Sequence, residues 1–280
     1  MTAAAVQAAL EVAAEFGVTS TEPLLLQETN NTVLWLRPHA VVAKVAVRAH
    51  SQDDIRLEFA MATELAALGA DTARPMPGAR PVVHPGTGFV VTLWEHLEGS
   101  DRTPVPPGAL AQSLRDLHGA LTQTGVEVPS FQAMLAKARD ALENDALTAP
   151  LAGADRDFLR ATHDRGLVAL ENVRFDERRL HGEPHDGNRI ATRDGVRWID
   201  FESACTGPLE WDLAFQPREV VDHFPEADQG LLNLLRSLNS ARVATWCLAS
   251  QHSQMRQHGE LHLRLLRQPS AQGWHPLDIP

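Results

Sequence analysis

The sequence predicts an α+β protein with two lobes: a small N-terminal lobe built from an antiparallel sheet and one helix, and a larger, mostly helical C-terminal lobe. Short β-rich runs separated by turn residues fill the first third of the 280 residues, whereas apolar residues at helical spacing dominate the rest. A connector rich in proline, glycine and charge follows residue 95. We therefore expect one lobe over residues 1–96 and the other over residues 97–280.

The N-terminal lobe is expected to begin with a helix and to continue as strands. Residues 1–16 are rich in alanine, have apolar residues at helical spacing and lack a basic leader, which favours an amphipathic helix over a signal peptide. A polar turn at residues 28–31 separates the first two strands. Strands are expected over residues 24–26, 32–36 and 41–47.

A helix and a hairpin complete the predicted N-terminal lobe. Residues 53–68 place their apolar side chains on one helical face, and Asp53 or Asp54 is expected to cap the helix. Residues 81–94 hold two β-rich runs around Pro-Gly-Thr-Gly, which is the turn chemistry of a hairpin.

The C-terminal lobe is predicted to be helical with one irregular interruption. Apolar residues recur at helical spacing in several stretches, whereas residues 180–201 are irregular and end in a short strand at 196–199. Helices are expected over residues 110–121, 131–147, 155–173 and 231–248, with a further helical pattern continuing to residue 266.

The charge balance restricts the classes of partner. With 25 basic and 36 acidic residues the formal net charge is −11, which argues against a nucleic-acid binder and permits a cationic small-molecule ligand. The two cysteines are too few for a disulfide framework, so we expect a cytoplasmic protein. No apolar run approaches the roughly 20 residues that span a bilayer, so we expect no membrane partner.

Three residues of the irregular stretch have the chemistry of phosphoryl transfer. Glu183 and Asn188 lie in one loop, and Asp200 closes the short strand that follows. A carboxylate can accept a hydroxyl proton, while asparagine and aspartate offer the hard oxygen donors that Mg²⁺ prefers. The combination favours Mg²⁺-dependent phosphoryl transfer, although a solvated turn also contains such residues.

Lys44 is the second unusual feature, because it lies in the middle of an otherwise apolar predicted strand. A buried charge is unfavourable unless it is paired. Taken alone, Lys44 is more simply interpreted as an edge-strand lysine in solvent. Beside the phosphoryl-transfer loop, we favour a functional interpretation.

Three segments resemble motifs of one known family. Residues 181–188 (HGEPHDGN) are similar to its catalytic loop H-G-D-x-H-x-x-N, residues 200–202 (DFE) to its metal-binding D-[FW]-[DE], and residues 207–214 (GPLEWDLA) to G-[DP]-x-x-[WY]-D-L-A. The family is that of the aminoglycoside phosphotransferases and choline kinase-like proteins. The resemblance implies a bilobal protein-kinase-like fold with a nucleotide-binding N-terminal lobe and a C-terminal lobe that carries the catalytic loop and the acceptor site.

The resemblance also implies roles for the catalytic loop. Glu183 would be the base that orients the acceptor hydroxyl, and Asn188 and Asp200 would hold Mg²⁺. His181, His185 and Asp212 would give structural support, with Asp212 as a brace for the loop backbone.

The implied nucleotide is ATP or GTP, bound by the N-terminal lobe. Lys44 would contact the α- and β-phosphates and Glu58 would anchor Lys44. The phosphate-covering turn would include Asn31 and Thr32, and the backbone of residues 95–97, with Glu95 and Leu97 at its ends, would meet the adenine.

Two departures from the family pattern bear on activity. Glu183 replaces the usual aspartate, which moves the carboxylate by roughly 1 Å, and a misplacement of that size can lower a rate on the order of 100-fold. The phosphate turn contains no glycine, so side-chain donors from Thr29, Asn30, Asn31 or Thr32 are expected to substitute. Either change would also fit a nucleotide-binding pseudoenzyme with a regulatory role.

The acceptor is expected to be a small cationic molecule with a hydroxyl group. An aminoglycoside-type antibiotic is the first prediction, and a metabolite kinase for an amino-alcohol, sugar or amino-sugar is the alternative. The oligomeric state is expected to be a monomer or a homodimer. Four acidic residues are candidates for the substrate wall: Glu202, Asp222, Glu226 and Asp228.

Overall fold

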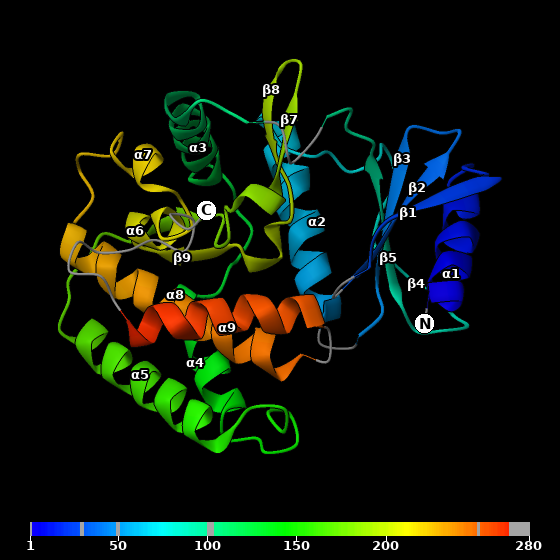
Figure 1. Ribbon diagram of the computed structural model, residues 1–280. Helices are drawn as coiled ribbons and strands as arrows, with labels where there is room; N and C mark the ends of the chain where they lie inside the picture. Colours follow the sequence, from blue (N-terminus) through cyan, green and yellow to red (C-terminus); the bar gives the residue numbers. More distant parts are fainter. Residues whose placement is uncertain (1, 29–30, 49–50, 100–103, 251–252, 269–280) are drawn as a thin grey trace. The chain divides into compact units, whose positions relative to one another are not determined.

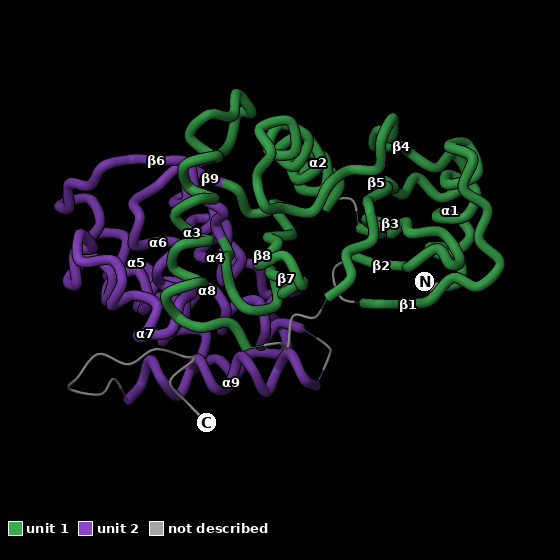
Figure 2. Tube along the Cα trace, turned by 90° about the horizontal axis from the view of Figure 1, so that it is seen from above, with its two compact units in different colours: residues 1–128, 183–204 green, residues 129–182, 205–280 purple. Residues whose placement is uncertain are grey.

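The computed structural model describes residues 2–28, 31–48, 51–99, 104–250 and 253–268. The chain forms two compact units, coloured separately in Figure 2. Unit 1 contains residues 1–128 and 183–204, and unit 2 contains residues 129–182 and 205–280. The chain therefore leaves unit 1, builds part of unit 2, and returns to unit 1 through the stretch that carries Glu183, Asn188 and Asp200.

Unit 1 is built on a five-stranded antiparallel sheet with the strand order β1-β2-β3-β5-β4. Helix α1 (Thr2–Glu15) and helix α2 (Gln52–Ala67) lie on opposite faces of this sheet (Figure 1). The strands are β1 (Glu22–Glu28), β2 (Asn31–Arg37), β3 (Val41–Ala46), β4 (Val82–Val83) and β5 (Val90–Glu95).

The two-residue period of the central strand β3 decides which helix each side chain meets. Val41, Ala43 and Val45 pack into the core under α1, whereas Ala46 packs against Ile55 of α2. Lys44 belongs to the second set, because successive side chains of a strand point to opposite faces. The apolar run of β3 is explained by the helices that cover both faces of the sheet, and Lys44 is buried against α2.

The rest of unit 1 carries the returning chain. A short antiparallel hairpin pairs Arg189 with Trp198 and so brings its two ends together. The backbone of Trp198 is bonded to the segment after α2, since Trp198 N donates to Asp71 O and Ala73 N donates to Trp198 O. The elements are α3 (Pro107–Leu121), the 3₁₀ turn η2 (Asp186–Asn188), β7 (Arg189–Thr192), β8 (Gly195–Trp198) and the 3₁₀ turn η3 (Phe201–Ser203).

Unit 2 is mostly helical, with one two-stranded sheet that pairs β6 with β9. Its core is formed where α4, α5, α8 and α9 pack, with Leu159 and Ala244 among the fully buried side chains. The elements are α4 (Phe131–Ala141), α5 (Gly153–Glu171), β6 (Arg178–Leu180), β9 (Cys205–Gly207), α6 (Leu209–Leu213), α7 (Arg218–Val221), α8 (Gln229–Ala249) and α9 (Ser253–Arg267).

The predicted α+β class and the order of its main elements are confirmed. Two local predictions were wrong. Helix α2 starts one residue earlier than expected, so Ser51 occupies the N-cap position. Asp53 and Asp54 lie in the first turn instead, where their negative charges interact favourably with the helix dipole. The helix expected over residues 131–147 ends at Ala141, because the Asn144 side chain accepts from Leu147 N and turns the chain. The lobe boundary expected at residues 96 and 97 stays a prediction.

None of the helices in the described parts of the chain combines the length and the apolar character needed to cross a bilayer.

Candidate functional site

Lys44 is surrounded by three carboxylates inside unit 1. Its Nζ lies 2.7 Å from Glu58 Oε2, 2.9 Å from Asp200 Oδ1 and 2.7 Å from Glu202 Oε1. The side chains of Lys44 and Glu58 are almost fully buried, that of Glu202 is mostly buried and that of Asp200 is 37% exposed. The pairing of Lys44 with Glu58 that we expected is present, and two further carboxylates share the same ammonium.

The fold brings these residues together from three places in the chain. Lys44 faces α2 from the middle of the sheet, and Glu58 is on the buried side of that helix. Turn η3 packs against α2 and carries Glu202, two residues after Asp200. Because Trp198 is fixed to the segment after α2, the chain reaches Asp200 at the edge of this cluster.

Asp200 has an unusual backbone conformation. Its φ of 66° and ψ of 63° lie in the left-handed region. No other non-glycine residue in the described part of the chain has a positive φ. Such conformations are unfavourable for most residues, although Asp tolerates them better than others, and they are enriched at functional sites. The surrounding structure therefore holds the Asp200 carboxylate in a specific orientation.

The carboxyl groups of the cluster outnumber the single ammonium that they share. Burial raises the pKa of Glu58 to about 8, and the charges of Asp200 and Glu202 act in the same direction while Lys44 opposes them. Burial likewise raises the pKa of Glu202. Burial alone would lower the pKa of Lys44, but Asp200, Glu58 and Glu202 outweigh it and raise this pKa. An additional positive charge would therefore be stabilised here.

Asn188 and Glu183 are joined through the backbone of the returning loop. Asn188 Nδ2 donates to Glu183 O at 2.9 Å, and His185 N donates to the same carbonyl at 2.8 Å. Ile199 N donates to Asn188 O at 3.0 Å, which places Asn188 beside the residue that precedes Asp200. Because its nitrogen is engaged in this way, the side-chain oxygen of Asn188 is the atom that could serve as an acceptor or a ligand.

Asn31 extends the cluster towards the β1–β2 turn. Its Nδ2 donates to Glu202 Oε1 at 2.6 Å, whereas its Oδ1 is buried and has no hydrogen-bond partner among the described residues. Thr32 is also buried, and it pairs with Val45 across the sheet. Thr29 and Asn30, expected as donors of the same turn, lie outside the described residues.

The residues of unit 1 fit a divalent cation such as Mg²⁺. Carboxylate oxygens of Glu58, Asp200 and Glu202 lie within 4.8 Å of one another. The unpartnered Oδ1 of Asn31 adds a buried neutral oxygen next to Glu202. Hard oxygen donors of this kind are the ligands that Mg²⁺ prefers.

The segment expected to meet the adenine follows strand β5. Glu95 N donates to Arg74 O at 2.9 Å and His96 N donates to Ala40 O at 3.0 Å, so both amides are engaged within the protein. The His96 ring stacks on Trp35 with 4.0 Å between ring centroids. Of the three backbone amides of residues 95–97, only that of Leu97 is still predicted to contact the adenine.

The expected brace by Asp212 is present within unit 2. Asp212 is fully buried, and its two carboxylate oxygens accept from His181 N at 3.0 Å and from Gly182 N at 2.8 Å. Gly182 has a φ of +90°, which a residue with a side chain rarely adopts. In unit 1, the His185 ring accepts from Gly187 N and caps turn η2. These contacts fix the backbone on both sides of Glu183.

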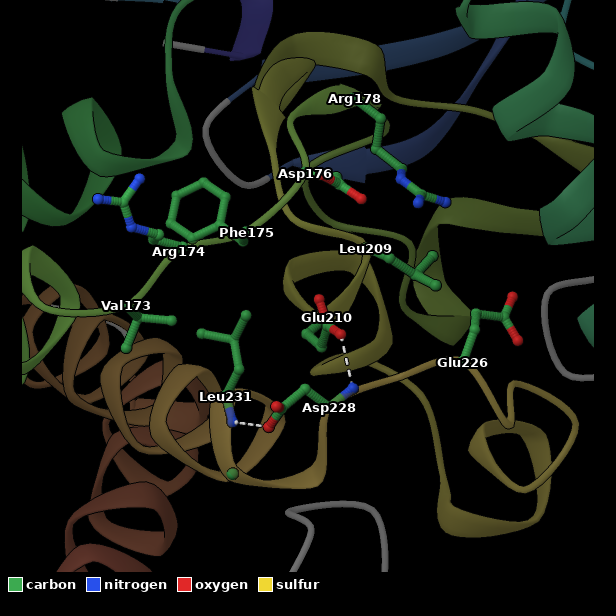
Figure 3. Close-up of a pocket in the computed structure, with 11 residues that line it drawn as sticks. Val173, Arg174, Phe175, Asp176, Arg178, Leu209, Glu210, Glu226, Asp228 and Leu231 are labelled. Carbon is green, nitrogen blue, oxygen red and sulfur yellow. Dashed lines mark hydrogen bonds between the residues drawn. The ribbon is translucent and has the colours of Figure 1, made fainter.

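Unit 2 contains an acidic pocket of about 500 Å³ (Figure 3). Glu226 and Asp228 line it, whereas Asp222 is exposed at the end of α7 and is not among the lining residues. Asp228 caps α8 through Leu231 N, and its own amide donates to Glu210 Oε1. The other lining residues are Val173, Arg174, Phe175, Asp176, Arg178, Leu209 and Gly230.

The structure thus gathers some predicted site residues more tightly than the sequence suggested. Glu202, expected at the substrate wall, contacts Lys44 and Asn31 instead of lining the acidic pocket of unit 2. Its contact with Asn31 was not anticipated at all. The signal available was the spacing after Asp200, since two residues along a tight turn can place both carboxylates near one ammonium. The roles of all these residues stay predictions.

A model of a known protein family, described as a phosphotransferase enzyme family, matches residues 21–234. No curated protein matches the chain in sequence.

Solved structures with similar folds bear the names of phosphotransferases and kinases. Aminoglycoside 2′-phosphotransferase-IIIa in complex with GDP is 14% identical, with a TM-score of 0.68 over 91% of this chain and 95% of that one. Amicoumacin kinase in complex with AMP-PNP, Ca²⁺ and Ami is 12% identical, with a TM-score of 0.69 over 93% of both chains. A choline/ethanolamine kinase family protein from Mesorhizobium loti is 16% identical, with a TM-score of 0.68 over 99% and 98%. These similarities confirm the protein-kinase-like fold.

Proposed function

The chain belongs to the phosphotransferase enzyme family, and we propose that it transfers the γ-phosphate of ATP or GTP to a hydroxyl group of a small cationic acceptor. The observation that carries this proposal is the cluster in which Lys44 meets Glu58, Asp200 and Glu202. A buried ammonium with an excess of carboxylates suits a site that binds phosphates together with a cation.

Within this proposal, Lys44 contacts the nucleotide phosphates and Glu58 holds Lys44 in place. Asn188 and Asp200 hold Mg²⁺, which when bound neutralises charge on the phosphates. The hydrogen bond from Asn188 Nδ2 to Glu183 O and the left-handed backbone of Asp200 support these roles, because both fix oxygen donors in orientation. The Leu97 amide contacts the adenine.

Glu183 is the residue that receives the proton in the transfer step. Its carboxylate accepts the hydroxyl proton of the acceptor while that oxygen attacks the γ-phosphorus, and the bond from the γ-phosphorus to the β,γ-bridging oxygen breaks. Because such transition states are loose, positioning and charge neutralisation supply most of the rate, and a base adds roughly 10²–10⁴-fold. The backbone contacts around Glu183 are consistent with a carboxylate held for this step.

We assign the acceptor to the cationic class, with an aminoglycoside-type antibiotic as the first candidate. The pocket of unit 2 supports a cationic ligand, because its acidic side chains outnumber its basic ones and it also has the ring of Phe175. The acidic residues are Asp176, Glu210, Glu226 and Asp228, and the basic ones are Arg174 and Arg178. A metabolite kinase for an amino-alcohol or amino-sugar would use the same chemistry. We assign the reaction to the cytoplasm, and the two buried cysteines are not joined in a disulfide.

A coupled nucleotide-turnover assay tests the proposal. Purified protein is supplied with ATP or GTP and Mg²⁺ across aminoglycosides, other antibiotics, sugars and amino-alcohols, and acceptor-dependent turnover is expected for a cationic member. Raised inhibitory concentrations in cells that express the protein would assign it to antibiotic resistance, whereas turnover without such a change would assign it to metabolism. Nucleotide binding with no transfer to any acceptor would contradict the proposal and identify a pseudoenzyme.

A further inference from the structure

Glu202 engages both side chains that the proposed function assigns to the nucleotide phosphates. Its Oε1 lies 2.7 Å from Lys44 Nζ and 2.6 Å from Asn31 Nδ2. The side chains of Glu202 and Lys44 are 19% and 11% exposed, so these contacts form largely out of water, where they are stronger than at the surface. Both donors are therefore bound to a protein carboxylate rather than open to a phosphate.

The same arrangement leaves negative charge where an anion would have to enter. Lys44 is in contact with three carboxylates. Glu202 belongs to turn η3, and Asp200 is the residue before that turn. A nucleotide without a cation would have to draw Lys44 and Asn31 away from Glu202 and would then face that carboxylate unpaired. A carboxylate that binds a cation releases both donors instead.

We propose that Glu202 makes nucleotide binding depend on a divalent cation. Its carboxylate binds Lys44 and Asn31, and it releases both side chains to the nucleotide phosphates only when it contacts the cation instead. The inference rests on the proposed nucleotide site. Asn31 Oδ1, buried and unpartnered among the described residues, offers a neutral oxygen at the same point and so favours a cation over an anion there. Glu202 is thus a positioning and specificity residue.

Equilibrium binding of ADP and of GDP to the full chain tests the proposal without requiring turnover. Calorimetric titrations are made once with excess Mg²⁺ and once in EDTA. For the unaltered protein, the Kd in EDTA is expected to be at least about 100-fold higher than in Mg²⁺, because the nucleotide phosphates are then brought next to the Glu202 carboxylate. In Glu202→Gln the gap is expected to shrink to about 10-fold or less, chiefly through tighter binding in EDTA.

Three further variants separate this effect from others. Glu22→Gln makes the same chemical change at an exposed position of β1 and is expected to leave the gap unchanged. Glu202→Asp keeps the charge and is expected to keep the gap. Asn31→Ala removes a donor, so it is expected to weaken binding in Mg²⁺ while the preference for the cation persists.

The outcomes distinguish the inference from the function on which it rests. A Glu202→Gln variant that folds, binds nucleotide and keeps the full gap overturns the inference, as does an unaltered protein whose gap is below about 3-fold. If Glu202→Gln does not fold, Glu202→Ser is measured against the same criterion, and the gap of the unaltered protein decides if neither folds. Failure to bind nucleotide in both Mg²⁺ and EDTA overturns the proposed function itself.

Discussion

The two units both bury carboxylates, but they satisfy them in different ways. In unit 1, Glu58, Asp200 and Glu202 share the single ammonium of Lys44, so the cluster holds more acidic groups than cations. In unit 2, Asp212 is fully buried and its two oxygens each accept from a backbone amide. The second arrangement is complete within the protein, whereas the first would be stabilised by a further cation. The difference indicates where ligand binding and where structural support reside.

The strongest test of this comparison is the loss of the Asp200 carboxylate. Asp200→Ala is expected to lower turnover by at least about 1,000-fold, because it removes the proposed cation ligand, which the backbone holds in a fixed orientation at the cluster. The measurement is kcat in the coupled assay, accompanied by a thermal melt. Asp194→Ala changes an exposed aspartate in the turn of the same hairpin and is expected to keep full activity. Retention of a tenth or more of the turnover by Asp200→Ala would exclude its assigned role.

A smaller loss is expected at Glu183, because a base contributes less than charge neutralisation. Glu183→Gln should reduce kcat by about 100-fold and leave the melting temperature nearly unchanged. Its backbone carbonyl, which binds His185 N and Asn188 Nδ2, is retained in the variant. Glu183→Asp restores the carboxylate at a shorter reach and should recover part of the rate. Equal and negligible effects of the Glu183 and Asp200 substitutions would contradict both roles.

The opposite behaviour is expected for the brace in unit 2. Asp212→Asn should lower the free energy of unfolding by about 3 kcal/mol, since the new NH₂ group cannot accept and leaves a buried backbone amide unsatisfied. Urea denaturation measures this, and the variant that remains folded should keep most of its nucleotide affinity. Asp222→Asn, at an exposed position, is the control and should change stability by less than about 0.5 kcal/mol. A stable Asp212→Asn protein would show that the brace is dispensable.

Much of the fold could be predicted because local patterns and tertiary structure agree. The apolar run of β3 and the helical spacing of α2 identify a sheet packed against a helix. Lys44 of β3 and Glu58 on the buried side of α2 then form an ion pair. The short elements β6, β9, α6 and α7 were missed, because their few residues carry no measurable periodicity.

The site was predicted by motif but not in its geometry. Asp200, Asn188 and Glu183 are recognisable from the residues around them, whereas the contacts of Glu202 are not. Asn31 and Glu202 are separated by 171 positions, and only the folded chain shows that they share a hydrogen bond. Likewise, Asp228 reads as an acidic helix start in the sequence, and its position beside Glu210 at a pocket depends on packing in unit 2.

A fourth test uses a group of unit 2 that is kept neutral by burial. His163 on α5 is fully buried near Thr245 of α8, and burial lowers its pKa to about 4. In the unfolded chain an ordinary histidine titrates near 6.5. The depressed pKa means that the stability contributed by neutral His163 is fully present above pH 6.5 and is lost as the pH falls towards 4.

Unit 2 is therefore expected to lose about 2 kcal/mol of stability between pH 7 and pH 5 through His163 alone. Urea denaturation at several pH values should show this slope, and His163→Gln should flatten it, because glutamine does not titrate. His223→Gln, at an exposed histidine of the same unit, should leave the slope as it is. If His163→Gln kept the full acid dependence, protonation of His163 would not be what destabilises unit 2. In that case the two buried groups would differ less than we infer. Burial would not be what keeps His163 neutral in unit 2, whereas the neighbouring carboxylates keep Lys44 charged in unit 1.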